Sequence, residues 1–556
     1  MRPLAVPLLL LSWASLAHAE PLPGVLDSHE NERRLPRANL PIDAYRPVIP
    51  ALQLTLPVAR SAAWAPPATR VQLRKVRFEG GTVFPLSELR EHYQPLIGRE
   101  VTLGQLQQFT QRLTERYRQE GYLLSYAYLP AQDIAEGRVR VVLVEGYIHD
   151  VDLEGDIGPA SAYLEQLLAR LKTERPLTGA TLDRYIGLAA RVPGVTLAAE
   201  LPSAEEPDGA TRLTVHARRK PFGAGLIVND GSREDAQALF DVHSNAQSRF
   251  AEQVEVSLLV PPGDDHAHYQ RLDYSQYLDA QGSQLLLSAS RYRSEPGTRI
   301  ALENGGELTQ KRESERYAIG LGQPVIVRPD EWLAVTGHFY AVTDHMHDQP
   351  DGPTLAQKYD TYVRALSFEG DWRKVDAGRL RIVSAGVYQG LDYLGARSDA
   401  DYDLDFLRLK VAGLQRDPLF GDWQGVVAGA LYWSDDQLPD SERAVFGGQS
   451  FAHGYPRDQA AGDKGWGVSY ELNYSIRRDV AGLQLVQPYA LIDAAQAWYN
   501  GGRIEDARLA SVAVGMRLGD GRSFNLSLEV AKPLRDDALD SRDRSPRLSL
   551  GFSFQM

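Results

Sequence analysis

The chain has 556 residues, of which 43% are hydrophobic and 24% charged, and its formal net charge is −13. This length predicts several structural units rather than one core. The acidic balance argues against a nucleic-acid partner, because nucleic-acid phosphates require a basic face. The sequence contains no cysteine, which excludes disulfides, cysteine-based zinc sites and a thiol nucleophile.

Residues 1–19 have the features of a secretory signal peptide. Arg2 gives a positive start, residues 4–16 form an apolar core, and residues 17–19 read A-H-A, a typical cleavage site. Beyond this segment no run of about eighteen apolar residues occurs, so no transmembrane helix is expected. We therefore expect the mature protein to leave the cytoplasm, and any membrane span to be made of strands.

Residues 20–70 are expected to form a linker with one short helix. Nine prolines among these 51 residues favour extended chain over regular structure. Asp27 and Glu30 form a capping box for a helix that ends before Pro36. Because this helix is polar nearly all round, it cannot fold by burying one face. It either frays in water or lies in a polar cavity.

A repeat follows. The sequence V-R-F-E-G at residues 76–80 returns as V-D-L-E-G at residues 151–155. Two helical segments and two strands are expected after each copy: helices at 86–93, 103–120, 162–171 and 177–190, with closing strands at 138–144 and 212–217. A fixed period with the same element order predicts two related β-α-α-β-β domains, at 71–146 and 147–220.

This element order, opened by V-x-F-x-G, resembles the POTRA domain, the periplasmic module of outer-membrane assembly and translocation proteins. The first copy matches better, because Leu153 of the second copy stands where the first has Phe78.

Residues 221–556 show alternation of apolar and polar residues instead of a helical period. The alternating apolar positions include Val254, Val256 and Leu258, then Leu407, Leu409 and Val411, then Leu526, Leu528 and Val530, and finally Leu548, Leu550, Phe552 and Phe554. This pattern predicts an all-β transmembrane barrel with lipid outside and water inside. Sixteen antiparallel strands would leave about 21 residues for each strand and its connection, and twelve or fourteen strands would also fit. The polar stretches 293–310 and 343–357 are expected to be long surface loops.

Between two strand-like segments, residues 446–458 read FGGQSFAHGYPRD. The Gly447-Gly448 and Tyr455-Pro456 steps are typical of turns. The whole arrangement of signal peptide, polar plug helix, two POTRA-like repeats and C-terminal barrel resembles the TpsB transporters of two-partner secretion, the haemolysin secretion/activation (ShlB/FhaC/HecB) family.

In that family a surface loop folds back into the barrel and carries a V-R-G-Y/F tip. The resemblance implies that residues 446–458 are this re-entrant loop, with the tip at Ala452-His453-Gly454-Tyr455. Its candidate residues are Gly447, Gly448, Phe451, His453, Gly454, Tyr455 and Arg457. A second family motif, F/G-x-D-x-G, matches residues 491–495. Its aspartate, here Asp493, would face the pore and pair with the loop arginine.

The chain departs from this pattern because His453 replaces the arginine, while Leu491 and Ala495 replace the outer residues of the second motif. Histidine is shorter and only partly charged near neutral pH, so it cannot form a permanent bidentate clamp. Two hypotheses remain. Either His453 contacts Asp493 more weakly, or Arg457 supplies the cation.

Catalytic signals are weak. Histidine and aspartate cluster at 264–268 and 344–348, but both clusters are expected in polar loops, so no metal is predicted. No G-x-S-x-G nucleophile elbow and no phosphate-binding G-x-x-x-x-G-K-S/T occurs. We expect neither an enzyme nor a cofactor.

The resemblance implies an outer-membrane translocation pore of a Gram-negative-type cell. Its POTRA domains would bind a large secreted partner, such as an adhesin or haemolysin, in the periplasm, while the barrel meets outer-membrane lipid. A barrel-assembly factor is the first alternative. A passive porin or nutrient receptor is the second.

Overall fold

The computed structural model describes residues 35–41, 51–56, 66–134, 136–202, 208–231, 234–260, 267–294, 300–301, 307–350, 357–477, 483–502, 506–520 and 523–556. Within these ranges residues 51–219 form one compact unit, and residues 35–41 with 220–556 form another. The predicted signal peptide and nearly all of the predicted plug helix lie outside the described residues. No described helix is long and apolar enough to cross a membrane.

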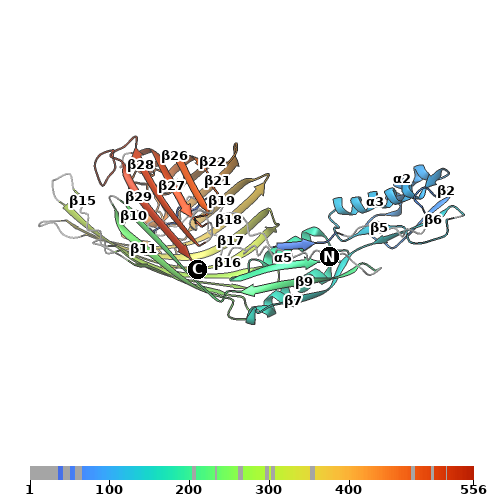
Figure 1. Ribbon diagram of the computed structural model, residues 1–556. Coiled ribbons are helices and arrows are strands. Elements are labelled where there is room, and N and C mark those ends of the chain that lie inside the picture. Colours follow the sequence, from blue (N-terminus) through green and yellow to red (C-terminus); the bar gives the residue numbers. More distant parts are fainter. Residues whose placement is uncertain are drawn as a thin grey trace, which may run out of the picture. The chain divides into compact units, whose positions relative to one another are not determined.

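The first repeat has a three-stranded sheet with two helices on one face (Figure 1). Its elements are β3 (Lys75–Glu79), α2 (Leu86–Tyr93), α3 (Leu103–Gln119), β5 (Tyr126–Tyr128) and β6 (Arg138–Val144), and a small second sheet pairs β2 (Arg70–Gln72) with β4 (Glu100–Thr102). Helix α3 begins at the Thr102–Gln105 capping box. Its buried side chains, Leu106, Phe109, Leu113 and Tyr117, form the apolar face expected from their spacing.

The second repeat has the same element order. It contains β7 (Tyr147–Glu154), α4 (Ser161–Leu168), α5 (Gly179–Ala189), β8 (Val195–Leu201) and β9 (Ala210–Arg219). A fourth strand, β1 (Ala51–Leu54), joins the sheet beside β8, which gives the order β1-β8-β9-β7. The sequence predicted no strand in the linker, because four residues with one alternation are too short to recognise.

Each copy of the repeated motif ends in a glycine, and the structural reason for glycine is the same in both copies. Gly80 and Gly155 both have positive φ, at 73° and 115°. A Cβ atom at Gly80 would lie 2.5 Å from the carbonyl oxygen of Leu143, and one at Gly155 would lie 2.0 Å from that of Ala217. The first strand of each repeat therefore ends tightly against the last strand, which only glycine permits.

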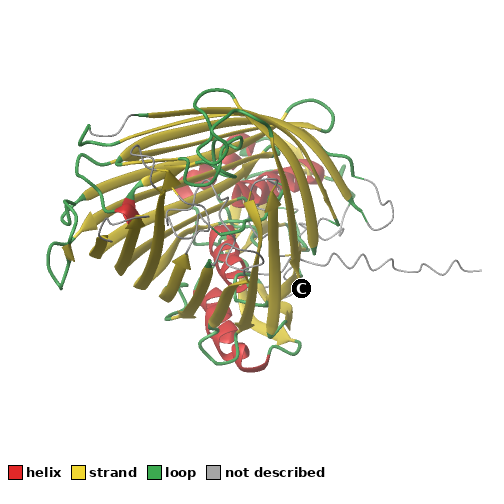
Figure 2. Ribbon diagram, turned by 90° about the vertical axis from the view of Figure 1, so that its left-hand side faces the viewer, coloured by secondary structure: helices red, strands yellow, loops and turns green. Residues whose placement is uncertain are grey.

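The second unit is a closed antiparallel barrel, which confirms the predicted fold class (Figures 1 and 2). The described residues form sixteen wall strands. They are β10 (Phe222–Gly231), β11 (Glu234–Asn245), β12 (Gln253–Val260), β13 (His268–Tyr277), β14 (Gln284–Ser294), β16 (Glu307–Val327), β17 (Glu331–Pro350), β18 (Gln357–Asp376), β19 (Arg379–Gly390), β21 (Leu407–Pro418), β22 (Trp423–Trp433), β25 (Lys464–Tyr474), β26 (Leu485–Trp498), β27 (Ala507–Gly519), β28 (Phe524–Pro533) and β29 (Arg547–Gln555). Two-residue strands β15 (Ile300–Ala301) and β20 (Arg397–Ser398) extend the wall locally. The barrel closes where β29 pairs with β10.

The predicted alternation places apolar side chains outside the wall and polar ones inside. Leu528 and Val530 of β28 are exposed, whereas Ser527 and Glu529 between and beside them are buried. On β21, Leu409 is exposed and its neighbours on the inner face, which include Arg408, are buried. The polar faces therefore line the barrel interior.

One expectation is wrong. The described residues of the stretch 343–357, which was predicted as a long surface loop, are strand, since β17 continues to Pro350 and β18 begins at Gln357. Most of the other stretch, 293–310, lies outside the described residues. The second histidine–aspartate cluster lies on this extension, where the His345 ring is 2.7 Å from Asp360 on β18. A paired strand can continue beyond an apolar band while carrying polar side chains, because its backbone groups remain hydrogen-bonded.

Candidate functional site

The connection from β22 to β25 folds into the barrel interior. It contains a short 3-10 helix, η6 (Asp440–Glu442), and a hairpin of β23 (Ala444–Phe446) and β24 (Ala460–Gly462). The hairpin tip, residues 447–459, carries all seven of the predicted pore-loop residues. We call residues 434–463 the inner loop.

Aromatic side chains hold the tip against the barrel wall. Phe446, Phe451 and Tyr455 are buried in one apolar cluster with inward-facing residues of β19, β21, β22 and β26. The Tyr455 hydroxyl donates to the carbonyl of Ala510 on β27 at 3.2 Å. Within the tip, the N–H of Gly448 donates to the carbonyl of Tyr455 at 3.1 Å, while that of Gly447 donates to the carbonyl of Phe451. The tip is thus a folded structure with its own hydrogen bonds.

Gly454 lies where the tip comes nearest to the wall. A Cβ atom there would lie 2.5 Å from the backbone nitrogen of Pro533 and 2.6 Å from the carbonyl carbon of Lys532, both on β28. Any larger residue would push the tip away from β28. Glycine at this position therefore sets the depth to which the neighbouring His453 enters the wall network.

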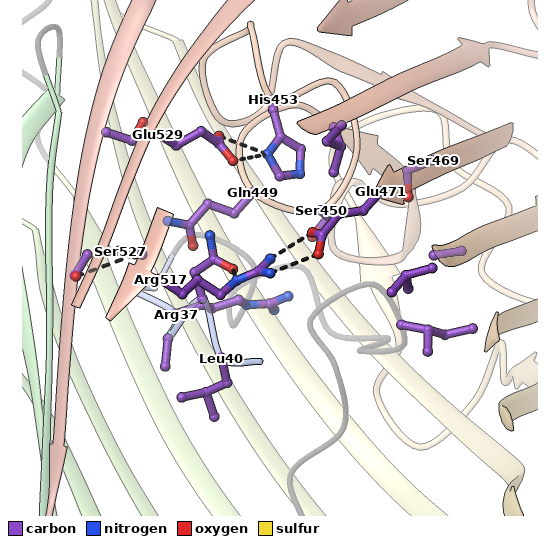
Figure 3. A pocket seen from close by; sticks show the side chains of 18 residues that line it. Arg37, Leu40, Gln449, Ser450, His453, Ser469, Glu471, Arg517, Ser527 and Glu529 are labelled. Carbon is purple, nitrogen blue, oxygen red and sulfur yellow. Dashed lines mark hydrogen bonds and ion pairs between the residues drawn. The ribbon is translucent and has the colours of Figure 1, made fainter. Parts of the chain in front are cut away.

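His453 binds two carboxylates through different atoms, and Figure 3 shows the one that its ring faces, Glu529. Its backbone N–H donates to Asp493 on β26 at 3.0 Å, and its ring Nδ1 lies 2.9 Å from Glu529 on β28. Asp493 also accepts a hydrogen bond from Ser511 on β27. Arg457 donates instead to Gln237 on β11 at 3.0 Å. The structure therefore brings His453 and Asp493 together, but the ring faces a carboxylate that the sequence comparison with the family did not indicate.

Glu529 belongs to a network that continues along the inner wall. It accepts a hydrogen bond from the Tyr489 hydroxyl at 2.7 Å, and the guanidinium of Arg517 stacks 4.1 Å from the Tyr489 ring centre. Arg517 makes two hydrogen bonds to Glu471, at 2.7 and 2.8 Å. This paired geometry, drawn in Figure 3, suits a buried arginine–carboxylate pair.

A second segment of the chain lies beside this network in the barrel interior. Residues 35–41 pass through the barrel, where Asn39 makes three hydrogen bonds. Its side chain donates to Tyr489 at 3.0 Å and accepts from Arg517 at 2.7 Å, and its carbonyl accepts from Asn525 at 2.9 Å. We call residues 35–41 the inner segment. A cavity of about 150 Å³ lies between it, the loop tip and the wall (Figure 3).

The inner loop makes a second set of contacts with the wall, to strands that precede it in the chain. Glu442 of η6 pairs with Arg408 on β21 at 3.2 Å and accepts from the Tyr340 hydroxyl on β17 at 3.0 Å. The Arg408 guanidinium stacks 3.8 Å from the Tyr388 ring centre on β19. Both charged side chains are almost fully buried, with 3% and 1% of their surfaces exposed. Removing one partner would leave the other charge buried and alone, which costs about 3–5 kcal/mol.

The arrangement can hold the inner loop and the inner segment in place against the barrel wall. Its charged groups are paired across loop and wall. Among the residues that the structure describes, no three His, Asp or Glu side chains are grouped to hold a metal ion. The sequence did identify Glu529 and Arg408 as polar members of alternating strands, but it gave no indication of the loop atoms that they meet. Asn39, Tyr489 and Glu442 were missed altogether.

Two family models match the chain. The ShlB-type POTRA domain matches residues 71–146, and the haemolysin secretion/activation protein ShlB/FhaC/HecB matches residues 367–518, which include the inner loop and Asp493. Among curated proteins, the chain is 21% identical to the heme/hemopexin transporter protein HuxB of Haemophilus influenzae, over 86% of this chain and 85% of HuxB. It is also 21% identical to the outer membrane transporter CdiB of Dickeya dadantii, over 72% of each chain.

Solved structures share the fold. CdiB from Escherichia coli superposes with a TM-score of 0.70 at 18% identity, over 91% of this chain and 94% of CdiB. BamA from Haemophilus ducreyi lacking POTRA domains 1–3 gives a TM-score of 0.51 at 14% identity, over 87% of this chain and all of that one.

Proposed function

We propose that this chain, which belongs to the TpsB transporters of two-partner secretion, the ShlB/FhaC/HecB haemolysin secretion/activation family, exports one secreted partner protein across the outer membrane. The observation that carries the proposal is that two segments of the chain lie inside the barrel. The inner loop and the inner segment both lie within it and are bonded to its wall and, through the wall network, to each other. A protein conduit must be closed at rest, and two releasable segments of the chain provide that closure.

We further propose that the two POTRA-type repeats lie in the periplasm and bind the partner before export. Open strand edges in such domains can accept an extended chain by β-augmentation, which supplies affinity through backbone hydrogen bonds. The partner is then a large secreted protein such as an adhesin or haemolysin, delivered unfolded. Folding of the emerging chain outside the cell supplies the driving force.

Secretion itself is the first test. A candidate partner is produced in cells with the full-length chain, without it, and with a version lacking residues 71–217, and its amount in the medium is measured. We expect release only with the full-length chain. Unchanged release, together with depletion of other outer-membrane barrels in cells that lack the chain, would instead identify a barrel-assembly factor.

The His453–Glu529 pair offers a sharper test of gating. In planar bilayers that contain the full-length protein, we expect Glu529→Gln to raise the fraction of time spent in high-conductance states at least several-fold. The reason is that it removes a buried carboxylate from beneath the loop tip. A passive porin would conduct as freely before the substitution as after it.

The matched control is Glu255→Gln. Glu255 is also an inward-facing carboxylate, on β12, and its cross-strand neighbours are His243 and Asp273 rather than residues of the inner loop. Equal effects of the two substitutions would mean that interior charge, and not the loop contact, controls conductance. His453→Arg should keep the closed state, because arginine can reach the same carboxylates.

A further inference from the structure

The sheet of the first repeat has one face that packs on the helices and one that is exposed (Figure 1). Val76 of β3 and Val139 of β6 lie in the core on the helix side. Because side chains alternate along a strand, the residues on either side of these valines point the other way. They are four cations: Lys75, Arg77, Arg138 and Arg140. We call this surface the cationic face. Arg77 and Arg138 each leave 76% of their side chains exposed.

Neighbouring strands place these cations directly beside one another. Lys75 pairs with Arg138, and Arg77 pairs with Arg140, in the parallel register of β3 and β6. Like charges opposite each other destabilise a strand pair. The ion pairs that the described residues make on this face use two carboxylates at 3.2–3.9 Å, one on β3 and one just before β6. Positive charge is therefore in excess here, although the whole chain has a net charge of −13.

The second repeat shows that this architecture does not require the like-charge pairs. Asp150 and Asp152 stand where the first repeat has Lys75 and Arg77, on either side of the first valine of the repeated motif. Asp150 lies opposite Arg212 on β9 and forms an ion pair with it at 3.3 Å. The second repeat thus has an attractive pair at the position where the first repeat has a repulsive one. A ligand with negative charge would relieve this repulsion.

The edge beside the cationic face is closed to a further strand. Edge strand β5 has three residues, and the hydroxyl of Thr114 on α3 accepts the Ala127 N–H at 3.0 Å. Tyr126 and Tyr128, on either side of the buried Ala127, have their rings on the exposed face, with centres 6.0 Å apart. A ligand of the first repeat would therefore meet cations and phenol rings on the face rather than backbone groups at the edge.

The spacing of the cations indicates the form of such a ligand. Within each strand the cations are two residues apart, about 6.6–6.8 Å, and the two strands are about 4.8 Å apart. Alternate side chains of any extended polypeptide have the same repeat of about 6.6–6.8 Å. An extended chain laid along the strands can therefore present one acidic side chain to each opposed pair of cations. Lipids in a fluid leaflet have no such fixed repeat.

We propose that the cationic face binds an extended segment of the exported protein that carries acidic residues at alternate positions. The proposal rests on the export function proposed above and assigns the chemistry that the first repeat recognises. Each acidic side chain lies between two opposed cations, so that binding offsets the repulsion within the pair. The phenol hydroxyls of Tyr126 and Tyr128 can donate to carboxylates or backbone carbonyls of the same segment.

Reversal of two charges separates binding from stability. Lys75→Asp with Arg77→Asp gives the first repeat the residues that the second has, opposite Arg138 and Arg140. We expect the urea midpoint of the first repeat, measured by pulse proteolysis of the full-length protein, to stay unchanged or to rise, because opposite charges then face each other. Ligand binding should nevertheless weaken. A fall in the midpoint would show that the cations serve the stability of the repeat and would overturn the proposal.

The probe is a labelled peptide with glutamate at alternate positions and threonine between them, added to the full-length protein in nanodiscs of neutral lipid. Fluorescence anisotropy measures its binding. We expect saturable binding that weakens as salt is raised, since exposed charges are screened. Binding to the variant Lys75→Asp with Arg77→Asp should be weaker by about tenfold or more. A peptide with glutamine in place of glutamate should not bind.

The matched control is Arg90→Glu with Arg112→Glu, which makes the same change in net charge at exposed positions of α2 and α3. It should leave peptide binding unchanged. Equal weakening by both variants would mean that net charge, and not the cationic face, attracts the peptide. The proposal would also be overturned if the unmodified protein bound no peptide, or if its cationic face captured labelled phosphatidylglycerol vesicles instead of the peptide.

Secretion connects the cationic face to export. The amount of the protein whose release into the medium depends on this chain is measured with the Lys75→Asp, Arg77→Asp variant and with the control. We expect a several-fold reduction with the first and none with the second. Full secretion with both would overturn the proposal and leave the export function standing. Failure of the unmodified chain to secrete would contradict the export function itself, while peptide binding would still test the cationic face.

Discussion

The two repeats have the same element order and differ in what they leave open. In both, a first strand ends at a glycine that lies against the last strand, and two helices cover one face of the sheet. The first repeat then satisfies the centre of its edge strand with Thr114, while the second leaves a seven-residue edge that a linker strand has joined. The same domain architecture can therefore have a sheet edge that is already hydrogen-bonded or one that accepts a further strand. The difference depends on a single buried hydroxyl and on the length of the edge strand.

The shared glycines give the largest expected effect and test whether the repeats are equivalent where they look alike. We expect Gly155→Ala and Gly80→Ala to destabilise their own repeats by about 2–5 kcal/mol, because each adds a strained positive φ and a steric overlap with a carbonyl oxygen. Gly155→Ala should cost more, since its Cβ would lie closer to that oxygen. Pulse proteolysis of the full-length protein in urea measures both, and a negligible loss in either repeat would contradict the common packing.

Thr114 tests the difference between the edges. Thr114→Val keeps the shape and removes the hydroxyl, so the buried N–H of Ala127 loses the oxygen that accepts its hydrogen bond at 3.0 Å. We expect a loss of about 1–3 kcal/mol from the first repeat, read from the same urea midpoints. Thr110→Val is the control, because the Thr110 hydroxyl is also buried but bonds only to the Gln107 carbonyl of its own helix. A similar cost for both would remove the special role of Thr114.

Glu145, just after β6, gives a smaller and pH-dependent effect on the first repeat. Burial acts to raise its pKa, but hydrogen bonds from the N–H groups of Val83 and Thr82 and the hydroxyls of Thr82 and Tyr117 outweigh it and hold the pKa below its ordinary value. A lowered pKa in the folded state contributes stability at neutral pH, and that contribution is lost as the pH falls below about 4.5.

The variant Glu145→Gln should therefore be less stable than the unmodified chain at pH 7, by about 1–2 kcal/mol. The two should converge as the pH falls through the lowered pKa of Glu145, because the carboxylate then becomes protonated. Urea midpoints at several pH values measure this directly, and a constant difference across the range would show that the charge is not involved.

The sequence was sufficient for the fold because its signals are local. The helical faces, the glycines of the repeated motif and the alternation of the barrel strands each lie within a few residues of one another. The partner of β1 lies about 150 residues away, and four residues with one alternation do not specify it. The same holds for Glu529 and Arg408. Alternation indicated that they face inward, but their partners depend on barrel curvature and on the depth of the inner loop.

His453 illustrates the remaining gap. The family resemblance predicted a contact between His453 and Asp493, and the contact in the structure uses the backbone N–H of His453, which any residue carries. The ring instead meets Glu529 on β28, two strands away from Asp493 on β26. This side-chain contact depends on the three-dimensional arrangement and is not indicated by the motif.

Strand β1 also limits the length of chain that can extend from the inner segment. The inner segment is fixed in the barrel at Asn39, and the next fixed point along the described chain is Ala51. Twelve peptide steps can span at most about 40 Å. Without the β1 pairing, the next fixed point along the described chain would be Pro67, whose carbonyl accepts from the Gly104 N–H at 2.9 Å, and the upper limit of the span would be about 100 Å. The pairing of β1 with β8 therefore limits how far the inner segment could move from its position in the barrel.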